Sequence, residues 1–256
     1  MAGEAATLIT HYYPTTRWID RRTARYHLLL LMLRRPFPRF RSRGEQVLFA
    51  SGLCVYALAA VLAGYYEYFD WDLRLARAIQ SLSAPWLKPL MVWVSALGSG
   101  WIAVALALTA GLTLIGLRLR TEGLICLAGL GLGRLVTSLL KLISGRPRPN
   151  DSLVQIIGGF HERSFPSGHV IFFVELFGFL FFLAFVLAKP GLARTAGLVI
   201  LATMIGLVGV SRIYLGAHWP SDVIGGYIAG GLWLMLMIET YRHQTTKTAA
   251  SGKSAA

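Results

Sequence analysis

The sequence contains few charged residues and few cysteines. Asp, Glu, Lys and Arg make up 14% of the 256 residues, against about 25% in an ordinary soluble domain, whereas hydrophobic residues make up 55%. This composition excludes an intrinsically disordered chain and argues against a water-soluble globule. The two cysteines, Cys54 and Cys126, lie within apolar runs. We interpret them as small core residues and not as part of a disulfide framework or a metal cluster.

The sequence also lacks the patterns of a metal site and of a β-barrel. It contains no HExxH motif and no cluster of carboxylates, so we expect no metal and no other cofactor. Its long apolar runs do not alternate between apolar and polar residues, and they exceed the length of barrel strands. The chain is therefore predicted to be all-α.

Six apolar runs are long enough to cross a hydrocarbon core about 30 Å thick, which requires roughly 17–25 residues of helix. We therefore predict a polytopic membrane bundle of six transmembrane helices within residues 47–243. A backward extension of the second span through Pro85–Leu97 is left open. The spans are Val47–Tyr66, Trp101–Leu117, Gly123–Ile143, Val170–Ala188, Thr195–Val210 and Asp222–Ile238.

Segments of different composition flank the predicted bundle. Residues 1–46 form a basic arm that contains the short apolar run His27–Leu33, flanked by arginines on both sides. This pattern favours a helix lying on the cytoplasmic leaflet over a signal peptide. Residues 244–256 are mostly Thr, Ala, Ser, Gly and Lys, which predicts a disordered tail.

The net charge of +13 is explained by membrane topology. Of the 25 Lys and Arg residues, sixteen lie outside the spans on the side of the two termini and seven on the opposite side. The other two, Arg134 and Lys141, lie within the third span. Because Lys and Arg are enriched on the cytoplasmic side, we predict that both termini are cytoplasmic. No nucleic-acid partner is expected.

The remaining polar residues are concentrated in three short stretches, each beside the end of a predicted span. With both termini inside, all three stretches fall at the extracytoplasmic edge of the membrane. Residues far apart in the sequence are therefore expected to meet at one depth. The stretches are Lys141–Pro149, Pro166–His169 and Ser211–Asp222.

Three cations are expected to converge at this edge, namely Lys141, Arg148 and Arg212. Cations that share one place repel one another unless an anion lies among them, and a tetrahedral phosphate suits the planar fork of Arg and the compact charge of Lys. Ser167 and Gly168, directly before a helix, add backbone N–H groups at its positive end. The pattern predicts a phosphate site.

Two histidines in these stretches provide reactive groups. Asp222 follows His218 by four residues, which brings the side chains together if a helix begins near Trp219. A carboxylate on one imidazole nitrogen leaves the other nitrogen as a nucleophile. His169 has no carboxylate partner nearby in the sequence. It is suited to protonate the departing oxygen and then to activate water.

Together the three stretches resemble the signature of the type 2 phosphatidic acid phosphatase family, the lipid phosphate phosphatases. Every specified position of Lys-x6-Arg-Pro, Pro-Ser-Gly-His and Ser-Arg-x5-His-x3-Asp is matched, and the resemblance covers roughly residues 47–240. It implies a six-helix membrane bundle and metal-independent hydrolysis. It also implies that His218 forms a phosphohistidine, that Asp222 orients it and that His169 is the general acid. The residues implied to bind phosphate are Lys141, Arg148, Ser167, Gly168 and Arg212.

Two other interpretations stay open. A non-catalytic membrane protein that binds or transports lipid phosphates would share the fold, but no binding role needs both His169 and His218. A vanadium-dependent haloperoxidase has a similar anion site, but such enzymes are soluble.

The sequence does not specify the substrate or the oligomeric state. Undecaprenyl diphosphate, phosphatidic acid, phosphatidylglycerol phosphate and diacylglycerol pyrophosphate all fit a phosphate on a hydrophobic anchor. Arg146, His161 and Arg163 would favour a diphosphate if they contacted a second phosphate. The short loops indicate a bacterial inner membrane.

Two ionisable residues lie inside the predicted spans. Arg134 precedes Lys141 by seven residues and Glu175 follows His169 by six, so both lie about 9–10 Å from the site along their helices. Ionisable groups in a membrane core are costly and face the bundle interior. We therefore predict a buried ion pair between Arg134 and Glu175, with substrate contact or proton transfer as the alternative.

Overall fold

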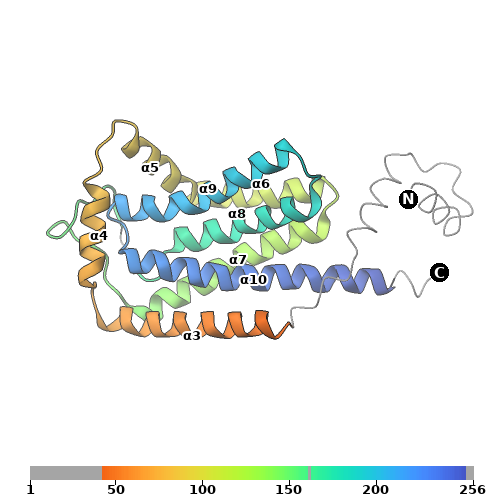
Figure 1. Ribbon diagram of the computed structural model, residues 1–256, viewed down its shortest axis with the longest axis horizontal. Coiled ribbons are helices and arrows are strands. Elements are labelled where there is room, and N and C mark those ends of the chain that lie inside the picture. Colours follow the sequence, from red (N-terminus) through yellow and green to blue (C-terminus); the bar gives the residue numbers. More distant parts are fainter. Residues whose placement is uncertain (1–41, 161–162, 252–256) are drawn as a thin grey trace, which may run out of the picture. The chain divides into compact units, whose positions relative to one another are not determined.

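The computed structural model describes residues 42–160 and 163–251, and in this part of the chain all regular structure is helical. The predicted interfacial helix His27–Leu33 lies outside the described residues. Figure 1 shows the helices in chain order. They are α3 (Arg43–Tyr65), α4 (Asp70–Gln80), α5 (Leu87–Leu97), α6 (Gly100–Gly116), α7 (Arg120–Ser144), α8 (Gly168–Leu187), α9 (Leu192–Tyr214) and α10 (Pro220–Ser251).

The predicted membrane bundle is confirmed. Helices α3, α7, α8, α9 and α10 are long and apolar enough to cross a membrane, and α5 and α6 provide a sixth crossing if they are counted as one span. In chain order, these five helices and the α5–α6 pair correspond to the six predicted spans.

Helix α8 lies within the bundle and packs against α7, α9 and α10 (Figure 1). Beyond His169 it is apolar except for Glu175, and ten of its 20 residues are buried, as is typical of an inner helix of a bundle. Its aromatic side chains interlock, with the Phe173 and Phe177 rings meeting edge to face at a centroid distance of 4.9 Å. This packing fixes the position of the residues at the start of α8, Gly168 and His169.

Two glycines allow α10 to approach α8 closely. A Cβ atom at Gly226 would lie 2.9 Å from the carbonyl oxygen of Ser167, and one at Gly230 would lie 3.0 Å from Cβ of Val174. Small residues at helix interfaces are a main source of packing energy in membranes, where burial from water contributes little. The first turn of α10 is therefore held beside the first turn of α8.

The second span is not one continuous helix. Between α5 and α6 the chain bends by 63°, and the break contains Gly98, Ser99 and Gly100. Gly100 has φ of +46°, a conformation that glycine adopts at little cost. The stretch Pro85–Leu97, left open as an extension of this span, contains α5, and α5 and α6 together are long and apolar enough to be one broken span.

Helix α4 was not predicted. It runs across the end of the bundle and not along it (Figure 1). It is amphipathic and has only 11 residues, with Asp70 and Asp72 in its first turn, where carboxylates interact favourably with the helix dipole. A search for apolar runs of spanning length does not detect such a helix.

The ends of the bundle also differ from the prediction. Helix α3 begins at Arg43, within the range 1–46 that was predicted as an arm. Helix α10 continues to Ser251, so the predicted disordered tail, residues 244–256, is corrected for residues 244–251. Extending an existing helix avoids the cost of nucleation, and Gln, Lys and Ala in this stretch are good helix formers.

Candidate active site

The motif residues come from the ends of four helices at one end of the bundle. Lys141 lies in the last turn of α7 and Arg148 in the loop that follows it. Ser167 caps α8, which begins with Gly168 and His169. Arg212 lies in the last turn of α9, His218 in the next loop and Asp222 in the first turn of α10.

The three predicted cations, Lys141, Arg148 and Arg212, are each held by a neighbouring oxygen. The ammonium of Lys141 donates to the carbonyl of Arg163 over 2.7 Å, and Arg148 donates to the carbonyl of Ala217 over 2.6 Å. Arg212, which is 2% exposed, donates to the hydroxyl of Ser95. These bonds orient the three side chains and do not neutralise them, because every acceptor is uncharged.

Phe160 lies between two of the cations. Its ring centroid is 5.4 Å from the guanidinium carbon of Arg148 and 5.0 Å from that of Arg212. Cation–π contacts at such distances are favourable. The ring therefore holds two like charges in the same region, which sequence reasoning did not foresee.

Several polar groups at the start of α8 are available to an anion. Ser167 is fully buried, and its hydroxyl has no hydrogen-bond partner among the described residues. Nε of Arg212 is also buried without a hydrogen-bond partner among the described residues. The first N–H groups of a helix have no acceptor within the helix, and a Cβ at Gly168 would lie 3.6 Å from Cε of Lys141. Buried donors and positive charge thus face one region, as a phosphate site requires.

The ring of His218 is 1% exposed and has different surroundings on its two nitrogens. Nε2 lies 3.4 Å from Nη1 of Arg148, and because a guanidinium only donates, we assign the lone pair of the ring to Nε2. Nδ1 lies 3.5 Å from Oδ2 of Asp222, which is longer than an ordinary hydrogen bond. This tautomer presents Nε2 to the cations as a potential nucleophile.

Charge and burial keep His218 neutral. Burial lowers the pKa of His218 well below its ordinary value of 6.5, and the three cations lower it further. The imidazole therefore retains a free lone pair at neutral pH.

Asp222 is fully buried, and several donors hold its carboxylate. Oδ2 accepts from the backbone N–H of Trp219 over 2.8 Å and from the hydroxyl of Ser164 over 2.5 Å. The bond to Trp219 resembles a capping box, in which a side chain in the first turn binds the N–H that precedes the helix. The local structure of α10 thus places the carboxylate beside His218.

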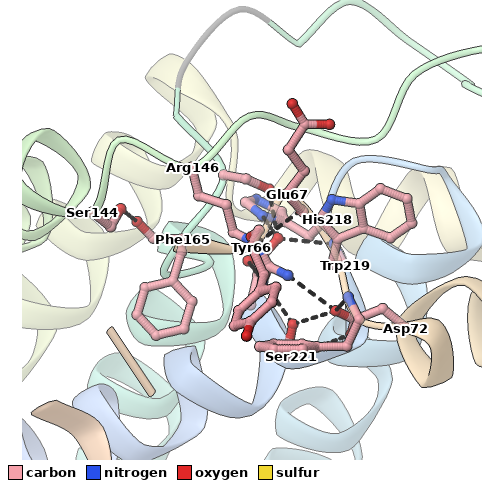
Figure 2. Close-up of polar contacts among 12 residues, drawn as sticks. Tyr66, Glu67, Asp72, Ser144, Arg146, Phe165, His218, Trp219 and Ser221 are labelled. Carbon is pink, nitrogen blue, oxygen red and sulfur yellow. Dashed lines mark hydrogen bonds and ion pairs between the residues drawn. The ribbon is translucent and has the colours of Figure 1, made fainter. Parts of the chain in front are cut away.

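Arg146 links Asp222 to a second carboxylate, Asp72, and Figure 2 shows Arg146 beside Asp72 and Ser221. Its guanidinium donates to Oδ1 of Asp222 over 2.7 Å and to Oδ2 of Asp72 over 3.0 Å. Asp72 comes from α4 and also accepts from the N–H and the hydroxyl of Ser221, each over 2.7 Å. All three charged side chains are fully buried, so α4 is tied to the nucleophile region through one buried ion network.

The prediction that Arg146 contacts a second phosphate is corrected by this network. Arg146 also donates to the carbonyls of Tyr66 and Glu67 over 3.2 and 3.0 Å, so its donors face the protein interior. Arg163 is exposed and donates to the carbonyl of Gly145 over 2.8 Å. His161 lies outside the described residues.

His169 is held by the break between α5 and α6. Its Nε2 lies 2.9 Å from the hydroxyl oxygen of Ser99, and the same hydroxyl donates to the carbonyl of Ser95 over 3.0 Å. Because a hydroxyl has one hydrogen, both bonds coexist when Nε2 of His169 carries a proton. A Cβ at Gly98 would lie 2.6 Å from Cδ2 of His169, so this glycine makes room for the ring.

Sequence reasoning missed the residues that support the motifs. One signal was available for Ser95, Gly98 and Ser99, because Gly and Ser interrupt an apolar run. Asp72 and Phe160 carry no comparable signal, since Asp72 acquires its role through Arg146, 74 positions away, and Phe160 through Arg148 and Arg212, 12 and 52 positions away.

Arg134 and Glu175 both line one cavity between α6, α7 and α8. Glu175 is 2% exposed, whereas Arg134 is exposed. The direct ion pair between them stays a prediction.

These features define a class of protein: a membrane protein, helical throughout the described residues, in which two histidines and three cations meet at one end of the bundle. The chain belongs to the PAP2 superfamily, whose family model matches residues 122–245. It is also 32% identical over 172 residues to phosphatidylglycerophosphatase B of Bacillus subtilis, a match that covers 65% of this chain and 81% of that protein. The predicted family is confirmed.

Other relatives agree with this assignment. Lipid A 1-phosphatase of Rhizobium etli is 37% identical over 114 residues, which cover 42% of this chain and 45% of that protein. The crystal structure of a transmembrane PAP2-type phosphatidylglycerolphosphate phosphatase from Bacillus subtilis matches with a TM-score of 0.64 and 26% identity, over 75% of this chain and 94% of that chain. The relatives are lipid phosphate phosphatases, and this chain is an integral membrane protein with several spans.

Proposed function

We propose that this protein hydrolyses phosphate esters or diphosphates of membrane lipids through a phosphohistidine at His218. The observation that carries the proposal is the environment of His218. Its Nε2 lone pair faces Arg148, the charges of Arg212 and Lys141 also act on the ring, and the carboxylate of Asp222 lies beside Nδ1. Phosphate in the cation cluster would place phosphorus next to this lone pair, which is the arrangement that nucleophilic catalysis needs.

In the first step, Nε2 of His218 attacks phosphorus and the bond from phosphorus to the lipid oxygen breaks. Charge spreads over the equatorial oxygens in the transition state. Lys141, Arg148, Arg212 and the N-terminus of α8 would stabilise that charge from fixed positions. Asp222 would stabilise the positive charge that develops on the imidazole ring.

His169 would serve both steps. It protonates the departing lipid oxygen as the first bond breaks. It then takes a proton from water as the water oxygen attacks the phosphohistidine, which releases phosphate and restores His218. The contact with Ser99 holds the ring of His169 in place for both steps.

We propose that the reaction needs no metal ion. Among the described residues, no three His, Cys, Asp or Glu side chains are grouped so that they could hold a metal, and the cations of the site provide the positive charge. Activity is expected to survive excess EDTA in a phosphate-release assay. Complete loss with EDTA, restored by magnesium, would contradict the proposal.

We further propose that both termini are cytoplasmic and that the active site lies at the extracytoplasmic edge of a bacterial inner membrane. The asymmetry of Lys and Arg supports the orientation. Exposed tryptophans near the site support its depth, because Trp is enriched at membrane interfaces. They are Trp71, Trp86 and Trp101, which are 40%, 64% and 86% exposed.

The function is tested by phosphate release from the four candidate lipids in detergent. Wild-type protein is expected to release phosphate from at least one lipid. His218→Ala is expected to release none, and His243→Ala, which changes an exposed histidine near the other end of α10, serves as the matched control. Absence of release by folded wild-type protein would favour the binding or transport interpretation, and bromide oxidation with bound vanadate would favour the haloperoxidase interpretation.

A further inference from the structure

A cavity of about 370 Å³ lies between α6, α7 and α8, directly beside the active site. Gly98 and Gly168, the neighbours of Ser99 and His169 in the chain, line the cavity, and most of its other lining residues are apolar, such as Leu108 and Leu127. Its size is within the range of ligand pockets. The cavity is therefore suited to hold the part of a lipid that adjoins the phosphate.

The cavity wall contains an acidic group. Glu175 lines the cavity and is 2% exposed, and its Oε1 has no hydrogen-bond partner among the described residues. Its carboxyl group lies over Gly133 of α7, where a Cβ would be only 2.6 Å from Oε2. A buried acceptor without a donor is costly, and an ionisable residue inside a membrane bundle commonly marks a substrate site.

We propose that Glu175 accepts a hydrogen bond from a free hydroxyl on the alcohol part of the substrate. The inference rests on the proposed phosphatase function and extends it to a substrate class. That class is a lipid phosphate with a glycerol hydroxyl close to the phosphate that is removed.

The distance from phosphorus to such a hydroxyl, plus one hydrogen bond, is similar to the distance between His169 and Glu175 along α8. Six residues of α8 separate Glu175 from His169, which corresponds to about 9 Å. In a glycerol phosphate the free hydroxyl oxygen is four bonds from phosphorus, or about 5 Å in an extended chain, and the hydrogen bond adds about 3 Å.

Among the candidate substrates, only phosphatidylglycerol phosphate carries such a hydroxyl. Phosphatidic acid and diacylglycerol pyrophosphate have acyl esters in its place, and undecaprenyl diphosphate has only carbon beyond its phosphates. Arg134 lines the same cavity and would favour the phosphodiester that this lipid also carries. Oε1 of Glu175 can accept the hydrogen bond from the hydroxyl while Oε2 of Glu175 forms an ion pair with Arg134.

The experiment compares phosphatidylglycerol phosphate with an analogue in which propane-1,3-diol replaces the bridging glycerol. The two lipids differ by one hydroxyl. Wild-type protein is expected to favour the hydroxylated lipid in kcat/KM by about tenfold or more, since a site built for a hydroxyl discriminates against an analogue without it. Glu175→Leu is expected to bring the ratio near one, and Glu175→Gln, which keeps an acceptor oxygen, is expected to keep part of the preference.

Two glycine variants provide a second test that leaves Glu175 in place. Gly133→Ala would displace the carboxyl group and lower the ratio, whereas a Cβ at Gly131 meets nothing within 4 Å, so Gly131→Ala should keep it. Equal rates of wild-type protein on the two lipids, or an unchanged ratio in folded Gly133→Ala, would overturn the inference and leave the phosphatase function standing. Failure to hydrolyse either lipid, or any other lipid phosphate, would instead refute the proposed function.

Discussion

Substitution of Arg146 tests the buried network most directly. In Arg146→Met the side chain keeps much of its length and loses its charge and all its donors. Asp72 and Asp222 then lose the guanidinium that lies between them at 3.0 and 2.7 Å. Two buried carboxylates would remain with no opposite charge to compensate them.

The expected destabilisation is large. Removal of one partner from a buried ion pair costs about 3–5 kcal/mol, because the other charge remains buried. Near 250 residues, 1 kcal/mol corresponds to a shift of about 2–4 °C in Tm, so Arg146→Met should lower Tm by roughly 10 °C. Asp222 would also lose a donor that orients it beside His218, and kcat should fall in protein that is still folded.

Thermal unfolding in detergent measures this effect, and Arg242 provides the matched control. Arg242 pairs with Glu45 at 3.2 Å, but these side chains are 23% and 33% exposed, and exposed pairs contribute at most about 1 kcal/mol. Arg242→Met should therefore change Tm by only a few degrees.

A double variant tests whether the unpaired carboxylates cause the lower Tm of Arg146→Met. Asp72→Asn removes one of the unpaired charges, so Arg146→Met with Asp72→Asn should unfold at a higher temperature than Arg146→Met alone. Equal Tm losses in Arg146→Met and Arg242→Met, or strictly additive effects of Arg146→Met and Asp72→Asn, would refute the assigned network.

Three further predictions concern the histidines. Gly98→Ala should displace the ring of His169, because the added Cβ would lie 2.6 Å from Cδ2 of that ring, and kcat should fall at least tenfold. Gly116→Ala is the control and should retain wild-type kcat, because its Cβ meets nothing within 4 Å. Equal rates in the two variants would contradict the placement of His169. Arg148→Met removes a positive charge that lowers the pKa of His218. The acid limb of the profile of kcat/KM against pH should therefore shift to higher pH, toward 6.5. A limb at the same or a lower pH would show that Arg148 does not act on His218. The lowered pKa also predicts that stability falls as the pH drops below 6.5, since the unfolded state then binds a proton that folded His218 does not; a Tm that is constant or rises over that range would contradict it.

The spanning helices were predictable because their signal is local. Each is a run of apolar residues whose length matches the hydrocarbon core, and no tertiary contact is needed to recognise it. Helix α4 lacks such a local signal, and for the bend between α5 and α6 the local signal is only the Gly and Ser residues that interrupt an apolar run. Helix α4 is short and amphipathic, and its position depends on the bond from Asp72 to Arg146, 74 residues later.

The residues of the candidate site also fall into those with a local sequence signal and those without one. The motif residues were predictable because each stretch carries a chemical group at a fixed spacing, such as His218 and Asp222 one helical turn apart. The partners that hold those groups were not predictable. A serine such as Ser99 or a phenylalanine such as Phe160 is common in a membrane protein and acquires its role only when the chain brings it to the site.

The arrangement of charge around His218 also explains why a second carboxylate is present. In the free protein the three cations keep the ring neutral and its lone pair available. In the proposed mechanism, the oxygens of a bound phosphoryl group would offset those cations, and attack would leave a positive charge on the ring. If Arg146 paired with Asp222 alone, it would cancel the carboxylate that would then balance this charge. Asp72 shares the guanidinium, so the group of Asp72, Arg146 and Asp222 would keep one net negative charge beside Nδ1, where the proposed phosphohistidine would need it.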